Sequence, residues 1–236
     1  MRANITKSFR FKQFLVHQEN CAMRVNTDGC LLAAWAHSFG ENILDVGCGS
    51  GVISLMLAQR NPSAQINAID IDPPSCADAT INFQSSPWHD RLEVICGNYI
   101  EWSFDRKFDL IISNPPFFSH GIKPPSAGRR VSRHTESLSS KDFLNKSVTH
   151  LTKNGRITII LPFQEFKEWE QCACDHGLAI GRLCRVCPDT EKPVHRIMAE
   201  FGYGMKRTEE ELHIRNSRQE YSPEFISLLR DFYLHF

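Results

Sequence analysis

From residue 42 onward, short apolar runs alternate with amphipathic segments of roughly 10 to 15 residues. The apolar runs have the length of strands, and we expect seven, at 42–46, 65–70, 92–96, 108–113, 156–161, 183–187 and 195–203. Helices are expected near 51–60, 74–85, 139–152 and 164–176. This alternation favours βαβ units, and therefore an α/β fold with a mostly parallel sheet and helices on both faces.

Three segments depart from the alternation. The last two predicted strands are joined by PDTEKPV (188–194), which has no room for a crossover helix, so we expect an antiparallel hairpin at one edge of the sheet. Residues 28–39 predict an amphipathic helix with Thr27 or Asp28 as its cap. Residues 221–236, YSPEFISLLRDFYLHF, are typical of an amphipathic helix that begins at Ser-Pro.

The chain has 236 residues, of which 42% are hydrophobic, and its mean hydropathy is −0.31. That length suits one well-packed domain and is short for two. No apolar run reaches the length of about 18 residues that spans a membrane, and the start MRANITKSFRFKQF lacks the apolar centre of a secretory signal. We therefore expect a cytoplasmic protein that does not span a membrane.

Charge is balanced over the whole chain but not along it. Lys plus Arg and Asp plus Glu both number 27. Residues 1–24 carry five basic side chains against Glu19 alone, and residues 119–134 carry a second basic group without any acid: Lys123, Arg129, Arg130 and Arg133. Clustered basic residues next to a site suit phosphate contact, although a solvated basic loop is the simpler alternative.

The nine cysteines are an odd number and show no framework of disulfides. Only Cys172, Cys174, Cys184 and Cys187 are spaced so that they could supply four thiolates to zinc. Because the second pair falls within a predicted strand rather than at a turn, we interpret these residues as small buried side chains and expect no metal.

A glycine-rich turn follows the first predicted strand. The stretch DVGCGSG (45–51) places Gly47, Gly49 and Gly51 between that strand and a helix. Glycines let the backbone approach a ligand closely, and the helix start presents unpaired N–H groups to it. The third glycine of the dinucleotide fingerprint is replaced by Val52, so a dehydrogenase is disfavoured.

Two carboxylates support a nucleotide-like ligand over an ordinary turn. Asp45 lies at the end of the first strand, and Asp70 ends the second, where it could accept hydrogen bonds from both ribose hydroxyls. Asp72 lies beyond the strand end and is less suited to this role.

DVGCGSG with an acid closing the next strand resembles the S-adenosylmethionine-dependent methyltransferases of the Rossmann-like class. That likeness implies a seven-stranded sheet with an antiparallel last strand, S-adenosyl-L-methionine as cofactor, and a cofactor site that includes Ile71. Asn98, in CGNY, stands where this class usually has an Asp that contacts adenine, and it can still accept through its carbonyl oxygen. We expect one methyltransferase domain over 1–236, with three parts: 1–41, an N-terminal extension and helix; 42–205, the Rossmann-like core; and 206–236, a C-terminal strand and helix.

The fourth predicted strand runs into Asn114, Pro115, Pro116 and Phe117. This looks like the (N/D)PP(F/Y) motif of methyltransferases that act on planar nitrogens: adenine N6, cytosine N4 or a glutamine amide. The Asn114 side-chain oxygen, beside the cofactor, and the Pro115 carbonyl could accept the two N–H groups of such a nitrogen, held rigidly because proline fixes φ. Phe117 could stack a base. The simpler alternative is that NPP only ends the strand with a turn, because Asn and Pro are ordinary turn residues.

A closer resemblance covers nearly the whole chain. Residues 11–36, which contain CAMRVNTDG, together with SPWHDR, SNPPFF and the ending RNSRQEYSPEFISLLRDFYLHF, are similar to the bacterial tRNA1(Val) adenine-37 N6-methyltransferase family. This implies an adenosine just 3′ of the anticodon of a valine tRNA as substrate, a base that costs little to splay out because it is unpaired. It also implies that Arg24, Thr27 and Asp28 lie beside the cofactor and that the basic residues at 119–134 contact tRNA.

The sequence therefore predicts an enzyme that methylates N6 of an adenosine in the tRNA anticodon loop. Two alternatives stay open: a protein methyltransferase acting on a glutamine amide, and a non-catalytic RNA-binding protein that has kept the fold. Oligomeric state and protein partners are not predicted.

Overall fold

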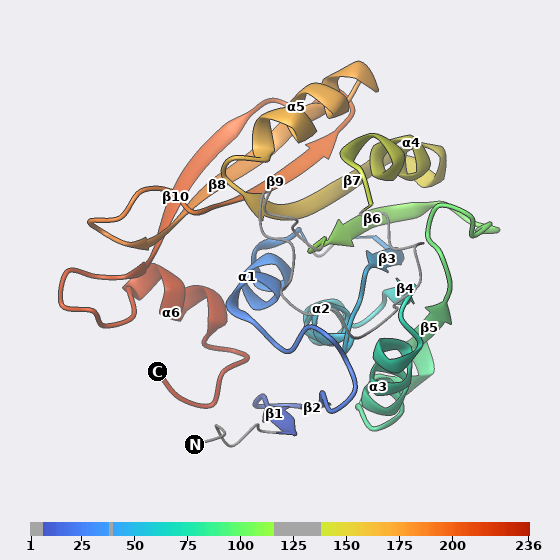
Figure 1. Ribbon diagram of the computed structural model, residues 1–236, viewed down its shortest axis with the longest axis horizontal. Helices are drawn as coiled ribbons and strands as arrows, with labels where there is room; N and C mark the ends of the chain where they lie inside the picture. Colours follow the sequence, from blue (N-terminus) through green and yellow to red (C-terminus); the bar gives the residue numbers. More distant parts are fainter. Residues whose placement is uncertain (1–6, 38–39, 116–137) are drawn as a thin grey trace, which may run out of the picture.

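The computed structural model describes residues 7–37, 40–115 and 138–236. Its main sheet has eight strands in the order β10-β8-β9-β7-β6-β3-β4-β5 (Figure 1). Their bounds are β3 Asn42–Val46, β4 Gln65–Asp70, β5 Leu92–Cys96, β6 Phe108–Ser113, β7 Leu151–Pro162, β8 Ala179–Asp189, β9 Arg196–Gly202 and β10 Thr208–Arg215.

The expected mostly parallel sheet is confirmed. Strands β7, β6, β3, β4 and β5 pair in parallel, and β9 is inserted antiparallel between β7 and β8. The number of strands is eight instead of seven, because β10 pairs in parallel with β8. The prediction that the β8–β9 hairpin lies at the edge of the sheet is therefore wrong: β10 forms the edge, and the hairpin lies next to it.

The strand β10 was expected only as an unplaced C-terminal strand within 206–236, because it lacks the apolar pattern that would have given its bounds. Its sequence TEEELHIR begins with four exposed residues, and Leu212 is its one buried side chain. Charged side chains on an edge strand discourage pairing with another chain. The charged side chains that protect this edge strand also break the apolar pattern by which strands are recognised in a sequence.

Six α-helices cover the two faces of the sheet in the described residues (Figure 1). Side chains of α1, α2 and α3 pack in one hydrophobic cluster with the sheet, and those of α4 and α5 in another on the opposite face. The helices are α1 Thr27–Trp35, α2 Val52–Arg60, α3 Pro73–Gln84, α4 Ser140–His150, α5 Phe166–Asp175 and α6 Pro223–Leu229. A 3-10 helix spans His89–Arg91.

The cap of α1 is Asn26, not Thr27 or Asp28 as predicted. The Asn26 side chain accepts a hydrogen bond from the backbone N–H of Gly29 at 2.8 Å. Asn, Thr and Asp stand next to one another and all are good caps, so composition alone could not choose among them. The α6 helix begins after the Ser222 cap, as expected, but spans only Pro223–Leu229.

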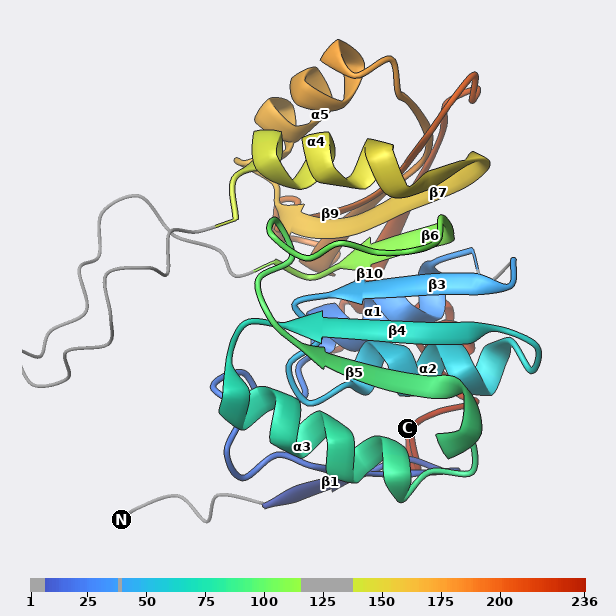
Figure 2. The ribbon, with the colours of Figure 1, turned by 90° about the vertical axis from the view of Figure 1, so that its right-hand side faces the viewer.

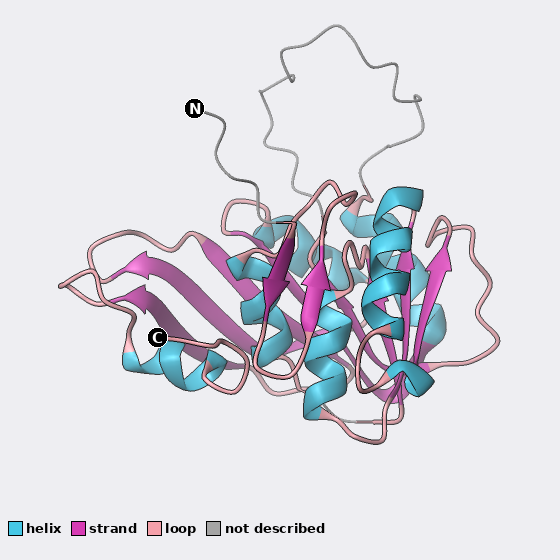
Figure 3. Ribbon diagram, turned by 90° about the horizontal axis from the view of Figure 1, so that it is seen from below, coloured by secondary structure: helices cyan, strands magenta, loops and turns pink. Residues whose placement is uncertain are grey.

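A small hairpin outside the main sheet packs against α3 (Figure 3). Strands β1 Ser8–Arg10 and β2 Leu15–His17 pair antiparallel. The backbone N–H of Lys12 donates to the carbonyl of Phe232 at 2.8 Å, and the Phe11 ring lies 5.9 Å from that of Tyr233. The beginning and end of the described chain thus pack together. None of the helices that the structure describes is long and apolar enough to cross a membrane.

Candidate functional site

The carboxyl ends of β3, β4, β5 and β6 meet at one edge of the sheet, where their arrowheads point the same way in Figure 2. Parallel α/β sheets bind ligands at this edge. The glycine-rich turn between β3 and α2 lies there, with φ of +73°, +55° and +80° at Gly47, Gly49 and Gly51. Residues with a side chain rarely adopt such angles.

The turn is held to β4 and packed against α3. The backbone N–H groups of Gly47 and Cys48 donate to the carbonyl of Ile69 at 2.8 and 3.2 Å. A Cβ atom placed on Gly51 would lie 2.4 Å from the ring of Phe83, whereas one on Gly47 would meet nothing within 4 Å. The backbone is therefore close-packed behind the turn and open at Gly47, which leaves room for a ligand.

Asp70, at the end of β4, is fixed beside this turn. Its Oδ2 accepts from the N–H of Gly49 at 2.7 Å, and its Oδ1 accepts from the N–H of Asp72 at 2.9 Å. Burial raises the pKa of the Asp70 carboxyl. Asp72 itself caps α3, accepting from the N–H and hydroxyl of Ser75 at 3.1 and 2.7 Å. Next to Asp70, half of the Ile71 surface is exposed, an apolar surface that could contact a base.

Asp45 lies at the end of β3, beneath the turn. It is fully buried, and its Oδ2 accepts from the N–H and hydroxyl of Ser54 at 3.2 and 2.7 Å. Its Oδ1 is buried without a hydrogen-bond partner. Burial raises the pKa of this carboxyl to about 7, against the lowering effect of Ser54. An unpartnered buried acceptor is costly, and a ligand that donates to it would remove the cost.

Asn114 follows β6 on the other side of β3. Just before it, the hydroxyl of Ser113 donates to the carbonyl of Val46 at 2.8 Å, which fixes the end of β6 to β3. Asn114 is 8% exposed, and its Oδ1 is buried and has no hydrogen-bond partner among the residues that the structure describes. A Cβ atom on Gly29 would lie 3.8 Å from its Nδ2, so the start of α1 approaches the amide closely. Pro115 is buried; Pro116 and Phe117 lie outside the described residues.

The remaining expected cofactor residues occupy different settings. The side-chain oxygen of Asn98 accepts from the N–H of Ile100 at 3.0 Å within a turn after β5, so part of its accepting capacity is already used. Arg24 and Thr27 are exposed. Asp28 forms an ion pair with Arg196, with its Oδ2 2.8 Å from Nε. Contacts of these four residues with a cofactor stay predictions.

Sequence reasoning missed two side chains of α3 that hold the N-terminal segment against the site. The Asp78 carboxylate accepts from the backbone N–H groups of Asn20 and Cys21, at 2.8 and 2.9 Å. The Asn82 amide exchanges two hydrogen bonds with the backbone of His17 and donates to the carbonyl of Ser50, in the glycine turn. The sequence signal that could have found them is their spacing. Asp78 and Asn82 are four residues apart and so lie on one face of the helix, next to the buried Ala79 and Phe83.

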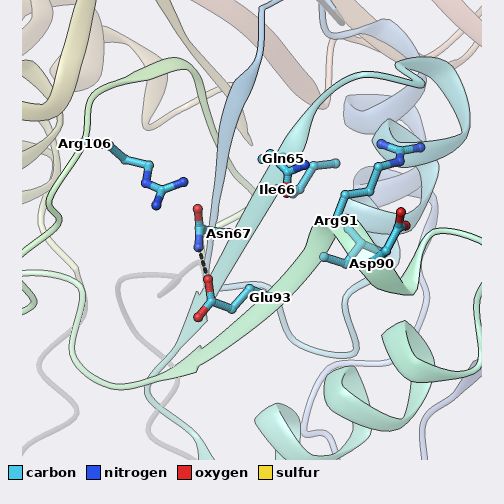
Figure 4. Close-up of a pocket in the computed structure, with 8 residues that line it drawn as sticks. Gln65, Ile66, Asn67, Asp90, Arg91, Glu93 and Arg106 are labelled. Atoms are coloured by element: carbon cyan, nitrogen blue, oxygen red, sulfur yellow. Dashed lines mark hydrogen bonds between the residues drawn. The ribbon is translucent and has the colours of Figure 1, made fainter.

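Three other features lie apart from this site. The basic residues expected to contact RNA, Lys123, Arg129, Arg130 and Arg133, are outside the described residues. Within the described ranges, one group brings three possible metal ligands within 4.8 Å of one another, Cys187, Glu211 and His213, so the four cysteines considered for zinc do not converge. A depression of about 140 Å³ is lined by residues near the amino ends of β4 and β5, among them Asn67, which donates to Glu93 at 2.7 Å (Figure 4). None of the residues of the glycine turn lines it.

The sheet, the glycine turn and the acid that follows define a methyltransferase. Residues 25–171 match the family described as "Methyltransferase small domain". A predicted O-methyltransferase from Agrobacterium tumefaciens has the same fold, with a TM-score of 0.68 and 18% identity over 87% of this chain and 96% of that one. A glycopeptide N-methyltransferase complexed with S-adenosyl-L-methionine aligns with a TM-score of 0.55 and 10% identity, over 76% of this chain and 100% of that one.

Curated relatives narrow this class. A tRNA1(Val) (adenine(37)-N6)-methyltransferase from Vibrio vulnificus (strain YJ016) is 42% identical over 97% of this chain and 96% of its own length. One of the same name from Mannheimia succiniciproducens is 40% identical over 99% and 98%. The chain belongs to the tRNA1(Val) (adenine(37)-N6)-methyltransferase family.

Proposed function

We propose that this chain transfers a methyl group from S-adenosyl-L-methionine to N6 of an adenosine in tRNA, the reaction that its curated relatives are named for. One observation carries the proposal from the site itself: the side-chain oxygen of Asn114 is buried and has no partner within the described residues, at the end of the sheet that holds the glycine turn. A buried acceptor in this position is suited to an amine that arrives with the substrate.

The residues of the turn fit the cofactor. Gly47 is open to a ligand, Asp70 is fixed by a hydrogen bond from Gly49 and would accept from the ribose hydroxyls, and Asp45 offers a second unpartnered oxygen within the described residues. Gly51 shapes the turn by its contact with Phe83. When bound, the cofactor supplies an electrophilic methyl group on a positively charged sulfur, which keeps the electron pair of the broken carbon–sulfur bond.

Asn114 and Pro115 position the amine in this proposal. The Asn114 Oδ1 and the Pro115 carbonyl accept its two N–H groups and direct the nitrogen lone pair toward the methyl carbon. Acceptors held in advance lower the barrier because nothing has to reorganise during the reaction. The nitrogen forms the new bond and releases one proton to water. No side chain has to act as nucleophile.

The substrate assignment rests on the relatives and on charge. Lys123, Arg129, Arg130 and Arg133 would contact tRNA phosphates, and Phe117 would stack the target base. A tRNA substrate also favours a cytoplasmic location. Arg24, Thr27 and Asp28 precede or begin α1, whose start approaches Asn114, and would close the cofactor pocket from that side.

A labelled methyl-transfer assay tests the function. Purified protein and labelled cofactor are offered unmodified tRNA, DNA and protein in parallel, and modified nucleosides are identified by mass spectrometry. We expect N6-methyladenosine in tRNA. Label in a protein glutamine would support the first alternative, and cofactor binding without any transfer would support a non-catalytic RNA-binding protein.

Asn114→Ala tests the site. We expect it to reduce transfer by at least about 100-fold, the typical effect of losing one positioned hydrogen-bonding group around a transition state, while cofactor affinity by titration calorimetry stays within about twofold. Asn67→Ala, an amide on β4 that pairs with Glu93 away from the site, is the matched control and should change neither. A large loss of cofactor affinity in Asn114→Ala would assign the residue to the cofactor instead.

A further inference from the structure

An aromatic side chain is exposed next to the site, at the carboxyl end of β7. Phe163 follows the last residue of this strand and is 48% exposed, the highest value for an aromatic side chain in the described part of the chain. Leaving a phenyl ring in water forfeits about 1.5–3 kcal/mol of burial free energy. Single exposed apolar residues are common, so the neighbours of Phe163 decide whether it has a role.

The position of Phe163 relative to Asn114 follows from strand register. In the parallel β6–β7 pair Ser113 lies opposite Ile159, so Asn114 comes opposite the next residue of β7. Phe163 comes three residues after that position, one residue past the end of β7. Phe163 and Asn114 therefore both lie just past the carboxyl ends of adjacent parallel strands, the end of the sheet where the glycine turn also lies.

A histidine stands beside Phe163 on the neighbouring strand. The last register pair of β7 and β9 is Pro162 with Arg196, and the N–H of Phe163 donates to the carbonyl of His195 at 3.1 Å. Phe163 and His195 thus lie next to each other, each one residue past the end of this strand pair. Both side chains are exposed.

Arg196 fixes the orientation of the His195 ring. Its Nη1 lies 2.7 Å from Nε2 of His195. Because a guanidinium can only donate, Nε2 of His195 is the acceptor in this contact. Arg196 is in turn held by the ion pair of its Nε with Asp28, and its side chain is only 19% exposed. The ring of His195 is therefore held by the Arg196 guanidinium, which is itself fixed by Asp28.

We propose that Phe163 and His195 form a stacking platform for an unpaired nucleotide adjacent to the adenosine that is methylated. Phenyl and imidazole rings are surfaces on which single-stranded RNA bases stack, and the imidazole N–H adds a donor for a phosphate or base oxygen. The inference rests on the proposed function, since it assumes that an RNA strand passes through this edge of the sheet. Its chemical class of ligand is a single-stranded nucleotide, not duplex RNA.

Steady-state kinetics with an anticodon stem-loop RNA test the platform. Phe163→Ala should raise the KM for RNA by about 5- to 150-fold, which corresponds to about 1–3 kcal/mol for one stacked base, and leave the KM for cofactor unchanged. Phe163→Tyr keeps the aromatic face and should stay close to the wild type. Tyr203→Ala removes an aromatic that is 44% exposed just beyond the opposite end of β9, and should have no effect.

A spectroscopic readout separates stacking from a merely structural role. In RNA that carries 2-aminopurine next to the target adenosine, binding to the wild type should quench its fluorescence, and Phe163→Ala should abolish the quenching at saturating protein. Wild-type quenching that persists in Phe163→Ala, or an unchanged KM for RNA, would overturn the platform. If the wild type does not methylate tRNA at all, the proposed function fails instead, so the two failures can be told apart.

Discussion

The buried carboxyl of Asp45 makes a specific prediction about stability and pH. Its pKa rises from 3.8 to about 7 in the folded protein, chiefly because of burial. A difference of this size corresponds to up to about 4 kcal/mol that ionised Asp45 costs the folded state. The sign follows from proton binding: between these two pKa values the folded state holds a proton that the unfolded state has lost, so this contribution lowers stability as pH rises toward 7.

Asp45→Asn should remove this dependence. The amide can still accept from Ser54, and it places a neutral donor where the unpartnered Oδ1 now lies. Measured by urea denaturation without ligand, the free energy of unfolding of the variant relative to the wild type should increase by about 3 kcal/mol from pH 5 to pH 8. Asp105→Asn, which changes an exposed carboxylate, is the control.

A constant difference between Asp45→Asn and wild type across this range would refute the reasoning, because it would mean that Asp45 stays ionised in the folded protein at every pH tested. We also expect the stabilised variant to bind the cofactor more weakly, since an amide N–H would replace the unpartnered carboxyl oxygen Oδ1 at the end of β3. A residue that destabilises the fold but contributes to ligand binding commonly produces such a trade-off between stability and activity.

Two further predictions concern the glycine turn. Gly51→Ala should lower the thermal midpoint and the cofactor affinity together, because its methyl group would lie 2.4 Å from the Phe83 ring at a φ of +80°; calorimetry showing both values unchanged would contradict the close packing. Asp70→Asn should weaken cofactor binding in titration calorimetry by at least about 10-fold, the scale of a hydrogen bond to a charged group, whereas Asp72→Asn, which keeps a good helix cap, should leave it nearly unchanged. Equal losses in both variants would mean that Asp70 is not the ribose acceptor.

How much of the fold was predictable depended on burial. The strands β3, β4, β5 and β6 have the bounds expected from sequence. Of these, β3 and β6 are almost wholly buried, as expected for strands covered on both faces, which are continuous apolar runs. Strand β7 begins at Leu151, five residues before the expected start, where LTKNG carries no such run. For the same reason the three-residue strands β1 and β2 were not predicted, and the charged edge strand β10 was expected within 206–236 without bounds.

The candidate site was predictable where its chemistry is local in sequence. The three glycines of DVGCGSG (45–51) and Asp70 at the end of the next strand can be recognised from the sequence alone. The contacts of Asp78 with Asn20 and Cys21, 58 and 57 residues away, do not. Likewise, the motif identified Asn114, but only the packing of β6 and α1 around it shows that its oxygen is buried and unpartnered.

The way the N-terminal hairpin is held has a consequence for synthesis. Its strands leave the ribosome early, but Asn82 and Asp78 emerge much later, and Phe232 and Tyr233, which meet the loop between β1 and β2, come almost at the end of the described chain. The segment that borders the glycine turn can therefore be held once α3 has emerged, whereas the contacts of Phe11 and Lys12 can form only after nearly all of the described chain has been made.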